Sequence, residues 1–70
     1  MENLLNAIHS LGYRTDIEEN SKKEFSIYSK DNDDDLLVNV YENSYTIQDN
    51  NVDDILINTL DKFKGDVDNV

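Results

Sequence analysis

The stretch LLVNVYENSYTIQ, residues 36–48, decides the fold that this sequence predicts. Its first half alternates with the two-residue period of a half-buried strand. One side of that strand carries Leu36, Val38 and Val40, and the other side carries Leu37, Asn39 and Tyr41. The ENS triplet that follows fits a tight hairpin loop, because asparagine tolerates a positive φ angle. Residues 45–48 then give a short return strand, with Tyr45 and Ile47 turned inward.

The chain upstream repeats this alternation twice. One strand is predicted near residues 13–18 and another over residues 24–30. The inward residues of these two strands are Tyr13, Thr15, Ile17, Phe25 and Ile27. The second strand turns Ser26 and Tyr28 outward. Because the connecting segments are short, the three or four strands should form an antiparallel meander.

A helix is predicted at each end of the chain. Residues 2–11 form the first helix, which ends at Gly12 and has apolar residues at helical spacing, namely Leu4, Leu5, Ile8 and Leu11. The second helix has Asn51 as its expected N-cap and acidic residues in its first turn, where the helix dipole favours them. Gly65 is expected to end it. Its predicted apolar stripe is Val52, Ile55, Leu56, Leu60 and Phe63.

These elements predict a two-layer α+β fold. Each helix has one apolar side, so both helices should pack on the same face of an antiparallel sheet of three or four strands. Residues 1–65 form this single domain, and residues 66–70 form a flexible tail because they show no pattern. The uncovered face of the sheet should carry Tyr28, Leu37 and Tyr41.

The composition favours a basic partner. The 70 residues include 16 acidic and 6 basic side chains, for a net charge of −10. Direct binding to nucleic acid is disfavoured because phosphates would be repelled, whereas basic proteins would be attracted. The chain has no cysteine, which excludes disulfides and thiolate metal sites. The acidic N-terminus and the lack of an apolar run of about 20 residues predict a cytoplasmic protein without a signal peptide.

An enzyme, a cofactor and a specific metal site are not expected. The single histidine, His9, has no nucleophile or glycine-rich phosphate loop near it in the sequence. The acidic run 31–35 and Glu42 match the spacing of an EF-hand calcium loop, but Leu36 stands where that loop needs glycine. A strand from Leu36 onward would also place Glu42 about 20 Å from Asp35. Weak binding of divalent cations by the run stays open.

The acidic residues predict instead a surface for a basic partner. The run 31–35 lies at one end of the predicted sheet, and Asp49 and Asp53 should return to that end. Tyr28 and Tyr41 are candidate aromatic anchors on the open face, since aromatic residues are enriched at binding hot spots. The candidate binding residues are Tyr28, Asp31, Asp33, Asp34, Asp35, Tyr41, Glu42, Asp49 and Asp53.

Three stretches, ENLLNAIHSLGYRTDI, DLLVNVYENSYTIQ and VDDILINTLDKFKG, add a resemblance in pattern and order. This layout resembles the small acidic anti-CRISPR proteins of phages and prophages that inhibit type II-A Cas9. The resemblance implies a helix–sheet–helix DNA mimic that binds the guide-loaded nuclease where it reads the PAM. In that family, acids near the hairpin between the last two strands contact the PAM-reading arginines. The resemblance therefore adds Asn43, beside Glu42, and Asp16 from the first strand as candidate contacts.

This chain departs from the family at two points. Its hairpin is the less acidic ENS, and the long acidic tail of the family is reduced to DVDNV. The run 31–35 would then carry more of the interface. The predicted function is an anti-CRISPR-like inhibitor, a monomer or weak dimer, that binds a CRISPR-Cas effector nuclease and blocks target DNA. Two alternatives stay open: an immunity or antitoxin-like protein that caps a basic nuclease, and a small oligomeric protein that uses the open sheet face as its interface.

Overall fold

The computed structural model describes residues 2–19, 22–32 and 34–64, and it confirms the α+β class. The elements are α1 (Glu2–Ser10), β1 (Arg14–Asp16), β2 (Lys23–Tyr28), β3 (Leu36–Tyr41), β4 (Tyr45–Ile47) and α2 (Asp54–Lys64). The strands form one antiparallel sheet in the order β1-β2-β3-β4, so the meander has four strands. Asp33, the helix end predicted at Gly65 and the tail predicted over 66–70 lie outside the described residues.

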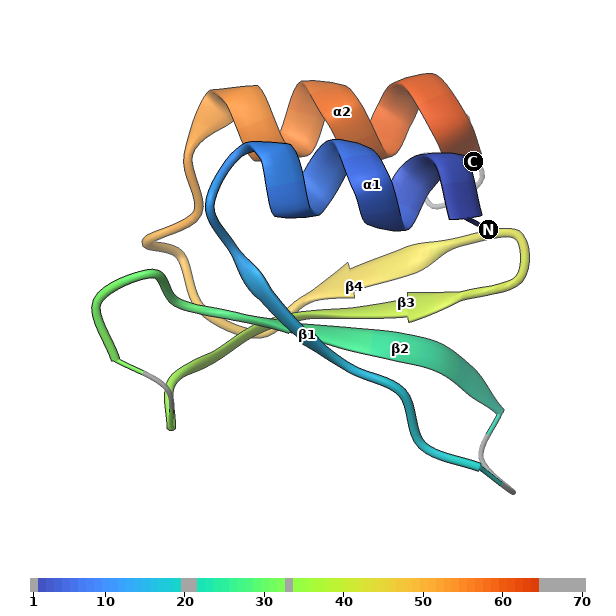
Figure 1. The fold of residues 1–70 in the computed structure, drawn as a ribbon, viewed down its shortest axis with the longest axis horizontal. Coiled ribbons are helices and arrows are strands. Elements are labelled where there is room, and N and C mark those ends of the chain that lie inside the picture. Colours follow the sequence, from blue (N-terminus) through green and yellow to red (C-terminus); the bar gives the residue numbers. More distant parts are fainter. Residues whose placement is uncertain (1, 20–21, 33, 65–70) are drawn as a thin grey trace.

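Both helices cover the same face of the sheet, as the sequence predicts (Figure 1). They lie side by side and run in opposite directions. A single core lies between the helices and the sheet, and the removal of its apolar side chains from water is the main force that drives folding. Its buried members are Leu4, Ile8, Tyr13, Phe25, Ile27, Leu37, Val38, Val40, Leu56 and Leu60.

The turn after α1 positions the strand that follows. Gly12 has φ +96°, a left-handed conformation that glycine adopts easily. The Gly12 amide donates to the His9 carbonyl at 3.0 Å, and the Tyr13 amide donates to the Ile8 carbonyl at 3.3 Å. These two bonds are those of a Schellman motif. The motif ends α1 at Ser10, one residue before the predicted end, and Tyr13 enters the core.

The start of α2 differs from the prediction. The Ile57 amide donates to the Asp53 carbonyl at 3.2 Å, and α2 begins at Asp54, so the N-cap residue is Asp53 and not Asn51. The Asn51 amide donates instead to the Asp49 carboxylate at 3.0 Å. This bond forms an Asx-type turn in the loop before the helix.

Several apolar residues that were predicted to face inward are exposed. On α2, Ile55 is 63% exposed and Phe63 is also exposed, whereas Leu56 is fully buried. Ile55 lies about 100° around the helix from Leu56, which places it outside the buried stripe. Ile17 lies beyond the end of β1 and is exposed. Ile47 is partly exposed because β4 is an edge strand.

A β-bulge in β3 changes which of its side chains face the core, so the predicted assignment of Leu36 and Leu37 is wrong. Ile27 pairs with Val38, but Tyr28 pairs with Leu36, so Leu37 is an extra residue on β3. The alternation shifts at this point, and the Leu37 side chain is only 3% exposed, within the core. Leu36 takes the place on the open face that was predicted for Leu37.

Candidate partner-binding surface

Two loops that are far apart in the sequence meet at one end of the sheet (Figure 1). They are the β2–β3 loop, residues 29–35, and the β4–α2 loop, residues 48–53. The amides of Gln48 and Asp49 both donate to the Leu37 carbonyl, at 2.7 and 3.3 Å, and so tie the second loop to the start of β3. In an antiparallel sheet the two loops leave from the same end. The chain therefore returns to the acidic run as the meander predicts.

The described acidic residues of these two loops form a surface that we call the acidic end. It consists of Asp31, Asp34, Asp35, Asp49 and Asp53. Local turns fix the first loop: the Asp34 amide donates to the Asn32 side chain, and the Asp35 amide donates to the Asn32 carbonyl, both at 3.0 Å. Asp33, the remaining acid of the predicted run, lies outside the described residues. The fold thus concentrates negative charge where these two polar loops meet.

Asp35 and Asp49 come from different loops, and their carboxyl groups interact directly. A hydrogen bond between the two side chains raises the pKa of Asp35, and partial burial and the negative charge of Asp49 raise it further. Two adjacent carboxylates repel each other when both are charged, so such a pair either shares a proton or favours a nearby cation. This pair makes the acidic end a favourable place for a basic group.

Tyr13 reaches the acidic end from the core. Its hydroxyl donates to Asp53 Oδ2 at 3.0 Å. Burial raises the pKa of Tyr13 to about 12, together with this hydrogen bond and the charge of Asp53. The Lys30 ammonium nitrogen lies 4.7 Å from the centre of the Tyr13 ring. A cavity of about 90 Å³ beside these groups is lined by Tyr13, Ser29, Lys30, Asp31, Leu37, Asn51 and Asp53.

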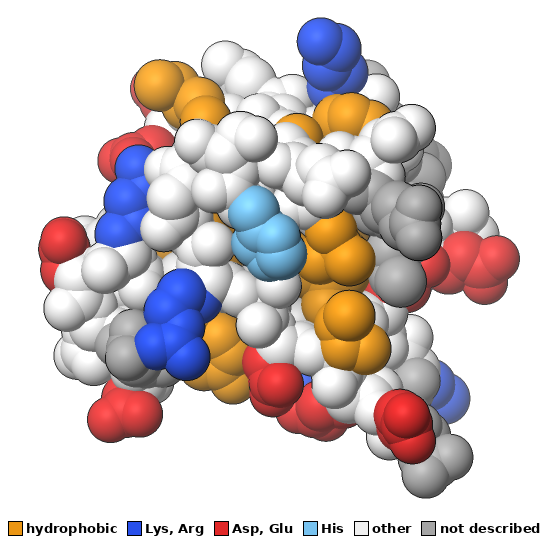
Figure 2. Space-filling view, in the orientation of Figure 1, with side chains coloured by type: hydrophobic (Ala, Val, Ile, Leu, Met, Phe, Trp, Pro, Cys, Tyr) orange, Lys and Arg blue, Asp and Glu red, His pale blue; other side chains and the backbone are white. Residues whose placement is uncertain are grey.

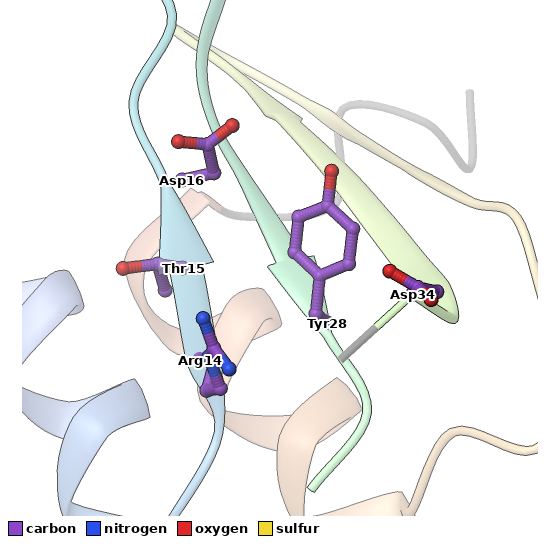
Figure 3. Close-up of a pocket in the computed structure, with 5 residues that line it drawn as sticks. All are labelled: Arg14, Thr15, Asp16, Tyr28 and Asp34. Atoms are coloured by element: carbon purple, nitrogen blue, oxygen red, sulfur yellow. The ribbon is translucent and has the colours of Figure 1, made fainter. Parts of the chain in front are cut away.

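A second hollow lies on the open face of the sheet, with a volume of about 250 Å³. Its lining residues are Arg14, Thr15, Asp16, Tyr28 and Asp34. In Figure 3 the Tyr28 ring stands between the β1 residues Arg14 and Asp16 on one side and Asp34 on the other. The hollow is smaller than common small-molecule pockets, which hold about 300–1,000 Å³. Asp34 lines this hollow and is also a member of the acidic end, so the hollow extends the acidic end onto the open face.

The hairpin candidates lie apart from the acidic end. The turn at Glu42 and Asn43 is at the opposite end of the sheet (Figure 1). It is tight, because the Tyr41 amide donates to the Ser44 carbonyl at 2.8 Å. Asp16 is on β1, and β2 separates that strand from the β3–β4 hairpin. The structure therefore does not bring Asp16 beside the hairpin, where the resemblance would place it.

Tyr28 and Tyr41 share the open face but do not form one aromatic anchor. Tyr28 pairs with Leu36, and Tyr41 pairs with Lys23 at the other end of β3. Five residue steps along β3 separate Leu36 from Tyr41, a distance of about 16 Å in a strand. The predicted dimer face also loses Leu37, which is buried in the core.

Sequence reasoning did not select Tyr13 or Lys30 as candidates. Tyr13 was assigned to the core from its alternation, and its hydroxyl contact with Asp53 joins segments 40 positions apart. Lys30 did offer a signal, because it is a positive charge immediately before the acidic run. Its position on the Tyr13 ring depends on how β1 and β2 pair, which the charge pattern alone does not give.

The space-filling view shows how the remaining charges are distributed. In Figure 2 acidic side chains lie around the margins of the face shown, with Lys and Arg side chains between them. The middle of this face shows apolar side chains and the histidine, whose Nε2 lies 2.7 Å from Thr15 Oγ1. The middle of this face is thus less acidic than its margins.

No protein-family model, characterised protein or solved structure matches this chain. Within the part of the chain that the structure describes, no group of three or more His, Cys, Asp or Glu residues is placed to hold a metal ion. None of the described helices is long and apolar enough to cross a membrane. The acidic end is the feature on which a functional proposal rests.

Proposed function

We propose that this protein is an inhibitor that covers a basic DNA-binding surface of a CRISPR-Cas effector nuclease with its acidic end. In this proposal it acts in the cytoplasm of a bacterial host, binds protein rather than nucleic acid, and blocks target DNA. The observation that supports it is the convergence of two loops on one end of a two-layer frame. That convergence brings Asp31, Asp34 and Asp35 of one loop to the same end of the sheet as Asp49 and Asp53 of the other, with Asp35 in contact with Asp49.

The charges explain why such a surface competes with DNA. Phosphates follow one another about every 1.7 Å along the duplex axis, and proteins bind them with Arg and Lys side chains. The same side chains make charge-assisted hydrogen bonds to carboxylates. A net charge of −10 also speeds the encounter with a basic surface. An effector whose basic groove holds the acidic end therefore has no free groove for target DNA.

A DNA-cleavage assay with guide-loaded Cas9 from a candidate host tests the proposal. The protein is added before or after target DNA, at low and at moderate salt. We expect inhibition only when the protein is added first, and weaker inhibition at higher salt. Inhibition that does not depend on the order of addition would contradict competition for the DNA site. No inhibition by the folded protein would contradict a CRISPR partner, and an affinity capture for basic nucleases would follow.

A further inference from the structure

The Lys30 side chain lies along the turn that joins α1 to β1. Its ammonium nitrogen is 4.7 Å from the centre of the Tyr13 ring. A methyl group built on Gly12 would lie 3.7 Å from both Lys30 Cδ and Lys30 Cε. The lysine stem therefore packs over a residue that has no side chain, and the charged group lies over the neighbouring ring.

The surroundings of Lys30 are those of a cation-binding site. The face of a tyrosine ring attracts a cation through its quadrupole. Asp53 accepts the Tyr13 hydroxyl hydrogen bond, and Asp31 and Asp53 line the same cavity as the ring and Lys30. We call the Tyr13 ring with Asp31 and Asp53 the cation seat. It is more than a group of acids, because an aromatic ring forms its base and a cation of this chain already occupies it.

We propose that Lys30 is a built-in occupant of the cation seat, and that an arginine side chain of a basic protein partner binds there by displacing it. This proposal rests on the proposed function to the extent that the partner is basic. The cavity left beside Lys30 is about 90 Å³, well below the roughly 300 Å³ at which ligand pockets begin. A second long side chain therefore needs the space that Lys30 fills.

The exchange of lysine for arginine is chemically reasonable. Lys30 is exposed, so its side chain can leave the seat without disturbing the core. A guanidinium group is planar and less strongly hydrated than an ammonium group, and it stacks on an aromatic face while it pairs with carboxylates. The apparent affinity for a competing cation is the intrinsic affinity multiplied by the fraction of molecules in which Lys30 has left the seat.

The test is a titration of the full chain with a hexa-arginine peptide, followed by NMR at low salt. Lys30→Met removes the internal cation, and Lys62→Met, at an exposed position on α2, makes the same charge change away from the seat. We expect Lys30→Met to bind the peptide about three- to tenfold more tightly than Lys62→Met. The Gly12 amide and the Tyr13 ring protons should shift on binding.

The outcomes separate the alternatives. Equal affinities of the two variants would show that only net charge matters and would overturn the proposal. Weaker binding by Lys30→Met, or tighter binding without a shift at Gly12 and Tyr13, would overturn it too. If Lys30→Met does not fold, Lys30→Gln is used and the same gain is expected. The titration contains no nuclease, so its failure is distinct from a failure of the cleavage assay.

Discussion

The two ends of the sheet differ in how they assemble charge. At the loop end, the 29–35 and 48–53 loops bring acidic residues from separate parts of the chain together. At the hairpin end, Glu42 and Asn43 form a tight turn that the Tyr41–Ser44 bond closes. The tight turn presents only its own two side chains, and the β1–β2 connection at the same end adds Glu18 and Glu19. The two loops at the loop end together present a larger set of described acidic residues. The comparison moves the expected interface from the hairpin, which the resemblance implied, to the loop end.

The largest effect on the free energy of unfolding is expected at Leu37, where the loop end joins the core. Leu37 is the bulge residue, it is buried, and its carbonyl accepts two amides of the 48–53 loop. Leu37→Ala should lower the free energy of unfolding by about 2–5 kcal/mol, because it leaves a cavity in the core. Leu36→Ala, at the neighbouring half-buried position, should cost clearly less. Urea unfolding of both variants checks this, and equal losses would contradict the bulge.

Removing acidic charge from the loop end or from the hairpin end separately tests which end of the sheet binds the partner. The triple variant Asp31→Asn, Asp34→Asn and Asp35→Asn should slow association with the effector by roughly 10–100-fold at low salt, because steering is lost. The matched triple variant Glu18→Gln, Glu19→Gln and Glu42→Gln changes charge equally at the hairpin end. It should slow association far less. Stopped-flow association rates at several salt concentrations measure the difference, and equal slowing by both triple variants would place the interface elsewhere.

Two tyrosine hydroxyls bond to carboxylates of α2 or of its N-cap residue, one at each end of the sheet. Tyr13 donates to Asp53 at the loop end, and Tyr45 donates to Asp61 in the second half of α2. Tyr13→Phe should lower the free energy of unfolding by about 1.5–3 kcal/mol, the usual range for a hydrogen bond to a charged group. Tyr45→Phe should cost less because Tyr45 is more exposed. Thermal unfolding of both variants gives the ranking.

The same tyrosine predicts a dependence on alkaline pH. The pKa of Tyr13 is raised to about 12 in the folded protein, whereas an unfolded tyrosine ionises near 10. The protonated hydroxyl therefore stabilises the fold fully below about pH 10, and this contribution is lost as the pH rises toward about 12. Tyr13→Phe should flatten the stability profile in that window. An unchanged profile in the variant would contradict the assignment.

The smallest effect on stability is expected from changes to the Asp35–Asp49 pair. The pKa of Asp35 is raised in the folded state, so the folded protein binds this proton more tightly than the unfolded chain. Asp35→Asn should therefore make the protein more stable at neutral pH, and the gain should shrink as the pH falls toward about 4. Glu19→Gln, exposed near the hairpin end, is the control. Melting temperatures across this pH range test the direction.

Much of the fold followed from local patterns. The alternation in each strand and the spacing of Leu4 and Ile8 gave the element order, and Gly12 marked the end of α1 because few other residues adopt its conformation. The bulge at Leu37 was missed, because an extra residue in a run of apolar residues leaves no mark in the sequence. The N-cap was misplaced by two positions, since several Asp and Asn residues near α2 can cap a helix equally well.

The candidate site was predictable only in part. The meander was enough to bring Asp49 and Asp53 back to the acidic run, because connection order alone fixes which loops share an end. The core position of Tyr13 was predicted, but its hydroxyl bond to Asp53 and its contact with Lys30 were not, since they depend on packing between segments that are distant in the sequence. The separation of Tyr28 from Tyr41 depended on the register of β2 and β3.

The antiparallel course of the helices has a practical consequence for orientation. Helix α1 begins and α2 ends near the β3–β4 turn, at the far side of the molecule from the acidic end (Figure 1). A linker joined to the chain before α1 or after α2 would therefore approach the domain from its hairpin side and leave the acidic end pointing away from the support. Tethered copies on a sensor surface or on a fusion partner would thus present the proposed interface outward, without a redesign of the domain.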